Sequence, residues 1–328
     1  MKILFSWTGV TSYMADCWRC LRQLPGVELR VVVEQAYSGR DFAAEQTLQG
    51  LDYLVVDQSG RDERLGTFLQ DYVPEVIFAG GWRSLTTGAV LDRYKEIPKI
   101  FCLDMPWRWS LRCLAARWVL RNFVKRFEAV YVPGPSAAFY AQWLGFKRIH
   151  RKLYAVNRRK FKIADGGIGN RKREGFLFVG RYSPEKRRDV IERAYAEYRK
   201  CGGKWSIDYY GQGGKFVQAE GMPQVYAEHA CLVLASAFDP WPLVMLEARM
   251  AGLEVIASDR CGNCEELGAH KVPYGEVKAL ARKMLAVEQG AVIPLPPDLD
   301  DYDCAAWASR TLKIAATVAE TGLTHRQD

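Results

Sequence analysis

The chain has 328 residues and a formal net charge of +8, with ordinary shares of hydrophobic (49%) and charged (26%) residues. Its length suits two α/β domains of about 150 residues each. No apolar run reaches the roughly 18–20 residues of a membrane span, and the N-terminus lacks a cleavable signal pattern, so we expect a cytoplasmic protein. The positive charge calls for an anionic partner. Because no nucleic-acid-binding motif accompanies it, we do not expect nucleic acid.

The first half alternates short apolar runs with longer helical patterns. Runs without polar alternation are typical of parallel strands buried on both faces, and their alternation with helices indicates a doubly wound sheet. Ligands of such sheets bind at the carboxyl ends of the strands, and Gly9 and Val10 follow the first strand. The predicted strands are Ile3–Phe5, Leu29–Val33, Tyr53–Val56, Val76–Phe78, Lys99–Leu103 and Ala129–Val132.

Residues 107–126 form a basic stretch with three tryptophans and no acidic residue. An amphipathic surface of this kind can rest on an anionic membrane. The alternative is an ordinary packed helix with a solvated basic face. The sequence leaves both interpretations open.

A break in the pattern falls at about residues 154–174, where basic residues surround the Gly-rich segment Asp165–Asn170 and a flexible linker is predicted. The alternation of strands and helices then restarts, which predicts a second parallel sheet. Its expected strands are Gly175–Val179, Trp205–Tyr210, Cys231–Ala235 and Glu254–Ala257. Helices are expected near residues 185–200, 243–251 and 274–289, and a last helix near 302–320.

Three features bear on metal binding. Cys17/Cys20 and Cys261/Cys264 are CxxC pairs that together could supply four zinc thiolates, but their distance in sequence favours simple packing of small side chains. The aspartates of residues 298–303 precede the last predicted helix, where capping is expected rather than metal binding. The four histidines show no ligand spacing, so no metal is expected.

The second half places cations at a strand end. Gly180 and Arg181 end the first strand of the second sheet, and Lys186 follows five residues later at a helix start. A planar guanidinium and a point-charged ammonium together suit a diphosphate, to which the helix N-terminus adds backbone donors. The alternative is a solvated surface pair.

Two carboxylates flank the next helix start. Asp239 follows the buried strand Cys231–Ala235, and Glu247 lies eight residues later, about one turn into the helix that begins at Leu243. At that position the Glu247 carboxylate can accept hydrogen bonds from the vicinal hydroxyls of a ribose.

In this order the motifs resemble those of the retaining glycosyltransferases of the GT-B fold, family 4 (glycosyl transferases group 1). The likeness is close over residues 176–267 and extends to the layout of the rest. It rests on Gly180-Arg181 with Lys186, Gly211-Gln212-Gly213, the acids Asp239 and Glu247, and Ser258-Asp259 with Gly262 and Glu265.

The resemblance implies an α/β fold with two doubly wound Rossmann-like domains facing a central cleft. Residues 1–155 would form the N-terminal, acceptor-side domain, and residues 156–174 a basic linker. Residues 175–300 would form the C-terminal, nucleotide-sugar-binding domain. Residues 301–328 would be a helix that returns to the first domain.

The implied reaction is transfer of a hexose-type sugar from a nucleoside diphosphate sugar to a saccharide or lipid-linked saccharide, without metal or other cofactor. It would serve cell-surface polysaccharide or glycoconjugate synthesis, in the cytoplasm or at the inner face of the membrane. Arg181, Lys186 and Asp239 would be catalytic, and Asp104 and Trp241 would lie on the acceptor or sugar side. The donor would be bound by Gly9, Val10, Gly180, Arg181, Lys186, Gly211, Val217, Leu243, Val244 and Glu247.

The chain departs from the family pattern at three positions. Asp239 replaces a glutamate, Pro242 stands where a glycine is usual and has no N–H to donate, and Leu103-Asp104 replaces a His-Asp pair. These changes affect the sugar-facing half of the predicted site. The alternatives are a GT-B-fold epimerase or phosphorylase, whose patterns or length fit less well, and a GT-B-like module that binds a partner without catalysis.

Overall fold

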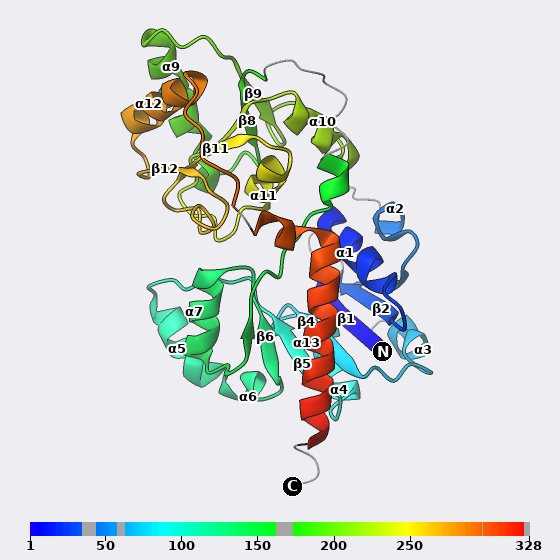
Figure 1. Ribbon diagram of the computed structural model, residues 1–328. Coiled ribbons are helices and arrows are strands. Elements are labelled where there is room, and N and C mark those ends of the chain that lie inside the picture. Colours follow the sequence, from blue (N-terminus) through cyan, green and yellow to red (C-terminus); the bar gives the residue numbers. More distant parts are fainter. Residues whose placement is uncertain (35–43, 58–62, 162–172, 297, 325–328) are drawn as a thin grey trace. The chain divides into compact units, whose positions relative to one another are not determined.

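The structure is a computed structural model, and it describes residues 1–34, 44–57, 63–161, 173–296 and 298–324. The chain divides into two compact units (Figure 1). Unit 1 comprises Met1–Ala155 and Cys304–Asp328, and unit 2 comprises Val156–Asp303. No helix within the described ranges is both long enough and apolar enough to cross a bilayer.

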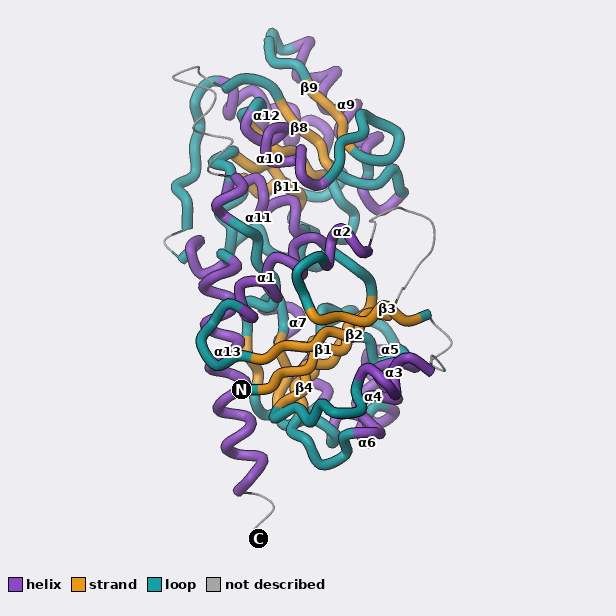
Figure 2. The backbone as a smooth tube through the Cα atoms, turned by 90° about the vertical axis from the view of Figure 1, so that its right-hand side faces the viewer, coloured by secondary structure: helices purple, strands orange, loops and turns teal. Residues whose placement is uncertain are grey.

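Unit 1 is built on a seven-stranded parallel sheet of order β3-β2-β1-β4-β5-β6-β7, whose strands β1 to β4 run side by side in Figure 2. The strands are β1 (Lys2–Thr8), β2 (Glu28–Glu34), β3 (Asp52–Val56), β4 (Val76–Gly80), β5 (Lys99–Cys102), β6 (Ala129–Tyr131) and β7 (Ile149–His150). The six predicted strands of this half are therefore confirmed. The two-residue strand β7 carried too short a pattern to be predicted.

Alternate residues of these strands separate two apolar cores. One face, with Phe5 and Phe78 stacked at 4.6 Å, is covered by α1 (Ser12–Arg22) and α13 (Cys304–Thr324), which lie together in Figure 1. The other face, with Phe101 and Val130, is covered by the remaining helices. These are α3 (Glu63–Phe68), α4 (Leu85–Arg93), α5 (Leu111–Val119), α6 (Arg121–Val124) and α7 (Pro135–Leu144), and a short helix α2 (Ala44–Leu48) precedes β3.

Unit 2 contains a five-stranded parallel sheet of order β12-β11-β10-β8-β9. Its strands are β8 (Phe176–Val179), β9 (Ile207–Tyr210), β10 (Cys231–Leu234), β11 (Glu254–Ser258) and β12 (His270–Val272). Helices α9 (Arg188–Lys200) and α12 (Val277–Glu288) cover one face. The other helices of the unit are α10 (Met222–Ala227) and α11 (Leu243–Met250), with 3-10 turns η1 (Pro184–Lys186), η2 (Ala219–Gly221) and η3 (Leu299–Tyr302).

The four strands predicted for this half are confirmed, and β12, with only three residues, was missed. The helix expected from residue 185 is interrupted, because Arg187 adopts a left-handed conformation (φ 48°) between η1 and α9. Residues 158–161, in the predicted linker, are helical, and residues 162–172 lie outside the described residues.

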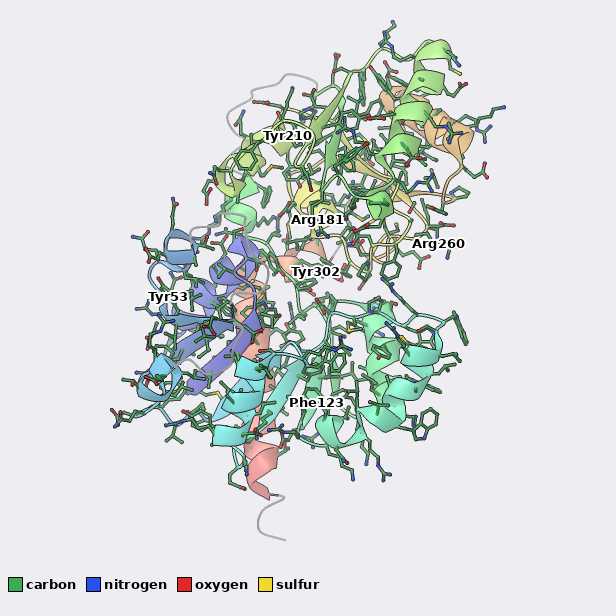
Figure 3. All side chains as sticks on the ribbon, turned by 180° about the vertical axis from the view of Figure 1, so that it is seen from behind. Tyr53, Phe123, Arg181, Tyr210, Arg260 and Tyr302 are labelled. Atoms are coloured by element: carbon green, nitrogen blue, oxygen red, sulfur yellow. The ribbon has the colours of Figure 1, made fainter. Side chains whose placement is uncertain are left out.

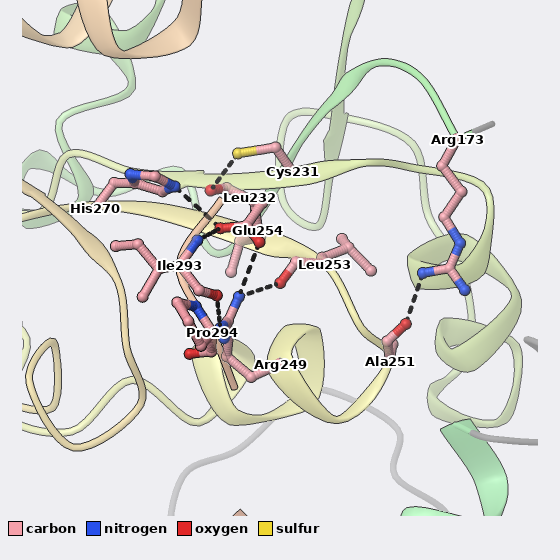
Figure 4. A network of polar contacts seen from close by, with 10 residues as sticks. All are labelled: Arg173, Cys231, Leu232, Arg249, Ala251, Leu253, Glu254, His270, Ile293 and Pro294. Atoms are coloured by element: carbon pink, nitrogen blue, oxygen red, sulfur yellow. Dashed lines mark hydrogen bonds and ion pairs between the residues drawn. The ribbon is translucent and has the colours of Figure 1, made fainter. Parts of the chain in front are cut away.

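A buried polar network ties α11 to the amino end of β11 (Figure 4). The Arg249 guanidinium is almost fully buried and donates to the carbonyl oxygens of Leu253 (2.9 Å), Ile293 (2.8 Å) and Pro294 (3.2 Å). It also lies 3.6 Å from the Glu254 carboxylate. The network therefore holds a buried charge with several acceptors, which is the condition for keeping such a charge inside a protein.

Candidate functional site

Each sheet has a topological switch point, where the strand order reverses. In unit 2 it lies between β8 and β10, and in unit 1 between β1 and β4. Ligands of open α/β sheets bind outside the carboxyl ends of the strands at such points. Arg181 and Asp239 follow β8 and β10, and Gly9 follows β1. The fold thus places predicted site residues at the switch point of each unit.

An ion pair joins two of the predicted catalytic residues. The Lys186 ammonium lies 2.5 Å from Asp239 Oδ2, and their side chains are only 18% and 11% exposed. Backbone bonds hold the two loops together, because Ala237 N donates to Glu185 O (2.7 Å). Lys186 and Asp239, 53 positions apart in sequence, thereby form a largely buried ion pair beyond the carboxyl ends of β8 and β10. The second carboxylate oxygen, Oδ1, can accept a further hydrogen bond.

Arg181 is the most available cation near η1. Arg187 is engaged with Asp189 (2.9 Å), and Arg188 with Glu192 (2.8 Å) and the carbonyl of Gly213 (2.6 Å). Arg181, labelled in Figure 3, is exposed and forms no ion pair within the part of unit 2 that the structure describes. Its guanidinium is therefore able to bind an incoming anion.

Glycine is needed where the loops of this site approach each other. Gly211 has φ +107°, and a Cβ there would collide with the carbonyl oxygen of Gly180. Likewise, a Cβ on Gly262 would collide with the carbonyl oxygen of Pro240. The Gly-x-Gly turn and the glycine after β11 thus let the four loops that follow β8, β9, β10 and β11 approach one another in pairs at the carboxyl ends of the strands.

Helix α11 begins beside these loops. Pro242 is its N-cap, and the proline carbonyl accepts hydrogen bonds from Met245 N (3.1 Å) and from Asn263 Nδ2 (3.2 Å). The amides of Leu243 and Val244 belong to the first turn, where helices leave N–H groups without an intrahelical partner. The proline therefore removes one donor from this helix end and leaves two.

Glu247 lies on α11 against a tyrosine that the sequence did not single out. Tyr226 OH, from α10, donates to Glu247 Oε2 at 2.7 Å. Burial raises the pKa of the Glu247 carboxyl, although the tyrosine hydrogen bond opposes this shift. The second oxygen, Oε1, has no partner among the described residues and can accept a hydrogen bond from a ligand.

The other two predicted residues of unit 2 lie differently. Val217 is half-buried just before η2, beside Phe216, whose ring is exposed. Trp241 is buried; its ring packs 5.6 Å from that of Tyr302, and its indole N–H donates to Glu266 (3.3 Å). The structure thus gives Trp241 a packing role, and a contact with the sugar or acceptor stays a prediction.

Unit 1 has its own cavity, of about 130 Å³, at the switch point between β1 and β4. Thr8, Gly81 and the exposed Asp104 line it. Tyr154 OH donates to Asp104 Oδ2 (3.2 Å), and burial raises the pKa of Tyr154. Gly9 adopts φ +84° after β1, and its amide donates to Glu34 O (2.9 Å). Val10 follows it, half-buried.

Capping of the last helix by the aspartates of residues 298–303 stays a prediction, although the Asp298 side chain makes no capping bond to the preceding turn η3. Asp303 accepts a hydrogen bond from the backbone N–H of Arg158 (2.9 Å), and Asp300 pairs with the guanidinium of the same residue. Among the described residues no group of three or more His, Cys, Asp or Glu side chains could hold a metal ion.

Known structures share this architecture. HepE from Anabaena, crystallised with UDP and glucose, matches with TM-score 0.62 at 18% identity, over 98% of this chain and 99% of that one. The α,α-trehalose-phosphate synthase (UDP-forming) from Burkholderia vietnamiensis matches with TM-score 0.70 at 12% identity, over 97% and 100%. A glycosyltransferase from Rickettsia africae matches with TM-score 0.69 at 11% identity, over 97% and 98%. The two parallel sheets are therefore those of the GT-B fold, which confirms the predicted fold class.

A family model matches a segment in the second half of the chain. Residues 173–289 match the family model described as Glycosyl transferases group 1. The matched segment lies in unit 2, and the resemblance to glycosyl transferases group 1 drawn from the motifs is confirmed at that level. No curated protein sequence matches the chain.

Proposed function

We propose that the protein is a retaining, family 4 glycosyltransferase that uses a nucleoside diphosphate sugar. The observation that carries the proposal is the Lys186–Asp239 pair together with the exposed Arg181, which has no ion-pair partner among the described residues, at the switch point of the unit that matches glycosyl transferases group 1. The fold neighbour HepE is described with UDP and glucose. Retention is proposed from the order of motifs alone.

In the proposed mechanism, Arg181, Lys186 and the amides of Leu243 and Val244 bind the diphosphate. As the bond from the sugar to the diphosphate breaks, negative charge grows on the leaving phosphate, and positioned donors of this kind stabilise it. Asp239 holds the lysine ammonium in place and keeps Oδ1 for a sugar hydroxyl. Glu247 Oε1 accepts from the ribose.

A panel of donors tests the proposal. We expect UDP, GDP or dTDP to raise the melting temperature of the full chain, and one matching nucleotide sugar to be hydrolysed slowly or transferred, with the product anomer identified by NMR. Stabilisation without turnover of any donor would favour the non-catalytic module. If no nucleotide stabilises the protein and no donor is turned over, nucleotide-sugar transfer is excluded.

Glu247→Ala is expected to weaken binding of that nucleotide about 10- to 100-fold, because hydrogen bonds to a charged group contribute about 1.5–3 kcal/mol. The ionised carboxylate is a much stronger acceptor than the protonated carboxyl group, and burial raises the pKa of Glu247. The affinity for nucleotide should therefore fall as the pH is lowered, and the fall should begin at a pH above the pKa of an ordinary glutamate. Calorimetric titration of nucleotide into the wild type and Glu247→Gln checks this, since the amide variant should lack the pH dependence. Equal affinities throughout would remove Glu247 from the site.

We further propose that the acceptor is a saccharide or lipid-linked saccharide and that residues 107–126 contact an anionic membrane. The structure leaves Trp109 and Trp118 of this stretch 87% and 67% exposed. Of its cations, Arg117 is hydrogen-bonded to Trp143 O (3.3 Å) and Arg126 to Asp92 (2.6 Å). An exposed surface of tryptophans and cations suits the headgroup region.

Changing Arg112, Arg117 and Arg121 together to glutamate should abolish sedimentation with anionic vesicles, because each basic residue near such a surface contributes about 1 kcal/mol. The matched control places the same charge change on exposed residues of unit 2, namely Arg260, Lys278 and Arg282. Loss of sedimentation in both variants, or in neither, would contradict the assignment to residues 107–126.

A further inference from the structure

A second, larger hollow opens on unit 1. This groove has a volume of about 820 Å³, within the range of roughly 300–1,000 Å³ typical of pockets for small organic ligands. It lies on the sheet face opposite α1 and α13, between α5, α6 and α7. Its walls are mostly apolar, with Phe101, Ala116, Phe123 (labelled in Figure 3) and Leu144 among them.

The charges of the groove all have one sign. Among its lining residues only Arg83 and Arg112 are charged, and no acidic residue lines it. Arg83 lies over the Trp82 ring at 4.4 Å, and neither arginine has an ion-pair partner within the described ranges of unit 1. An apolar groove with two unpaired guanidinium groups complements a hydrocarbon chain with an anionic group.

The groove adjoins the cavity that Asp104 lines. The two hollows share Trp82, Phe101, Leu103 and Met105 as walls. Trp82 follows β4 and Leu103 follows β5, so the shared wall lies at the carboxyl ends of the strands. The two hollows therefore adjoin through these shared walls, with Asp104 on the side of the smaller cavity and the two arginines on the side of the groove.

We infer that this groove binds the hydrocarbon chain of an anionic amphiphile, whose polar head is the acceptor and points toward Asp104. The inference rests on the proposed function for the identity of the head as acceptor. A free saccharide has no apolar surface to bury in such a groove, whereas each buried methylene strengthens binding about fourfold. The substrate class that fits both hollows is thus a lipid-linked acceptor with a phosphate near Arg83 and Arg112.

Binding of alkyl phosphates below their aggregation concentrations tests the inference without turnover. We expect dodecyl phosphate to bind the full chain, and octyl phosphate to bind more weakly by on the order of 10²-fold. Ala115→Trp, which fills the groove from an exposed position on α5, should weaken dodecyl phosphate binding at least tenfold. Arg83→Ala with Arg112→Ala should lower the affinity for dodecyl phosphate and leave that for dodecyl maltoside unchanged.

The control is Leu111→Trp, on the same helix, exposed and outside the groove lining, which should bind as the wild type does. The inference is overturned if the wild type binds no dodecyl phosphate, or if both tryptophan variants behave alike. Nucleotide binding is measured on the same samples. If the protein binds nucleotide but no amphiphile, the inference about the groove is refuted and the proposed function is not. If it binds the amphiphile but no nucleotide, the proposed function is refuted and binding of a hydrocarbon chain in the groove is not.

Discussion

Replacing Lys186 by alanine is expected to lower the turnover of the matching donor about 10²–10³-fold at saturating donor, the usual cost of removing one positioned group that stabilises developing negative charge. The ammonium is fixed at 2.5 Å from Asp239 and is only 18% exposed, so water replaces it poorly. Initial rates and nucleotide affinity would be measured together. Lys200→Ala is the control, because that exposed lysine pairs only with Glu197 on α9.

The same variant leaves Asp239 as a buried carboxylate without its cation, which alone could distort the loop. Lys186→Ala combined with Asp239→Asn separates the two effects. If the lysine only neutralises Asp239, the double variant should recover most of the rate. If it acts on the diphosphate, the rate should stay low although thermal stability recovers. Turnover within threefold of the wild type for Lys186→Ala would place Lys186 outside the catalytic machinery.

Arg249→Met is expected to lower the free energy of unfolding by about 3–5 kcal/mol, the typical cost of breaking a buried pair by removing one partner. Three carbonyl oxygens would lose their donor at once. Glu254 would keep His270 at 3.0 Å and the amide of Ile293 at 3.1 Å but lose the arginine charge. Urea unfolding followed by circular dichroism measures the change.

Arg260→Met provides the matched control for this loss of stability. That side chain is 63% exposed and lies 3.9 Å from Asp259, so the free energy of unfolding should change by less than about 0.5 kcal/mol. A loss below 1 kcal/mol for Arg249→Met would show that the methionine side chain packs well enough to offset the lost hydrogen bonds.

The fold was predictable because its parallel strands are buried on both faces and so appear as unbroken apolar runs, such as Val76–Phe78. The predicted cations and carboxylates were recognisable by their place after those runs. Strands β7 and β12 were not, because two or three residues carry no periodic signal. Arg249 was missed because an arginine in a helix ordinarily indicates a solvated face.

Long-range pairing accounts for the rest of what the sequence did not show. The contact of Lys186 with Asp239 and that of Tyr226 with Glu247 each join residues from different strand–helix units. No local pattern encodes such a contact. Tyr226 lies in the short helix α10, and nothing in its sequence surroundings indicates that its hydroxyl donates to Glu247. The Ala79-Gly80-Gly81 run directly after a buried strand was the one available sign of the cavity in unit 1.

The return of α13 to unit 1 has a consequence for synthesis on the ribosome. Unit 2 is an insertion in unit 1, and its two ends meet, because Val156 N donates to Tyr302 O at 3.0 Å. All strands of unit 1 leave the ribosome before residue 155, but the helix that covers one face of their sheet comes after residue 303. Because domains generally fold as units during translation, unit 2 can fold first, while the face with Phe5 is covered only by α1 and still lacks Trp307 of α13. A nascent chain arrested before α13 should therefore recruit chaperones through unit 1.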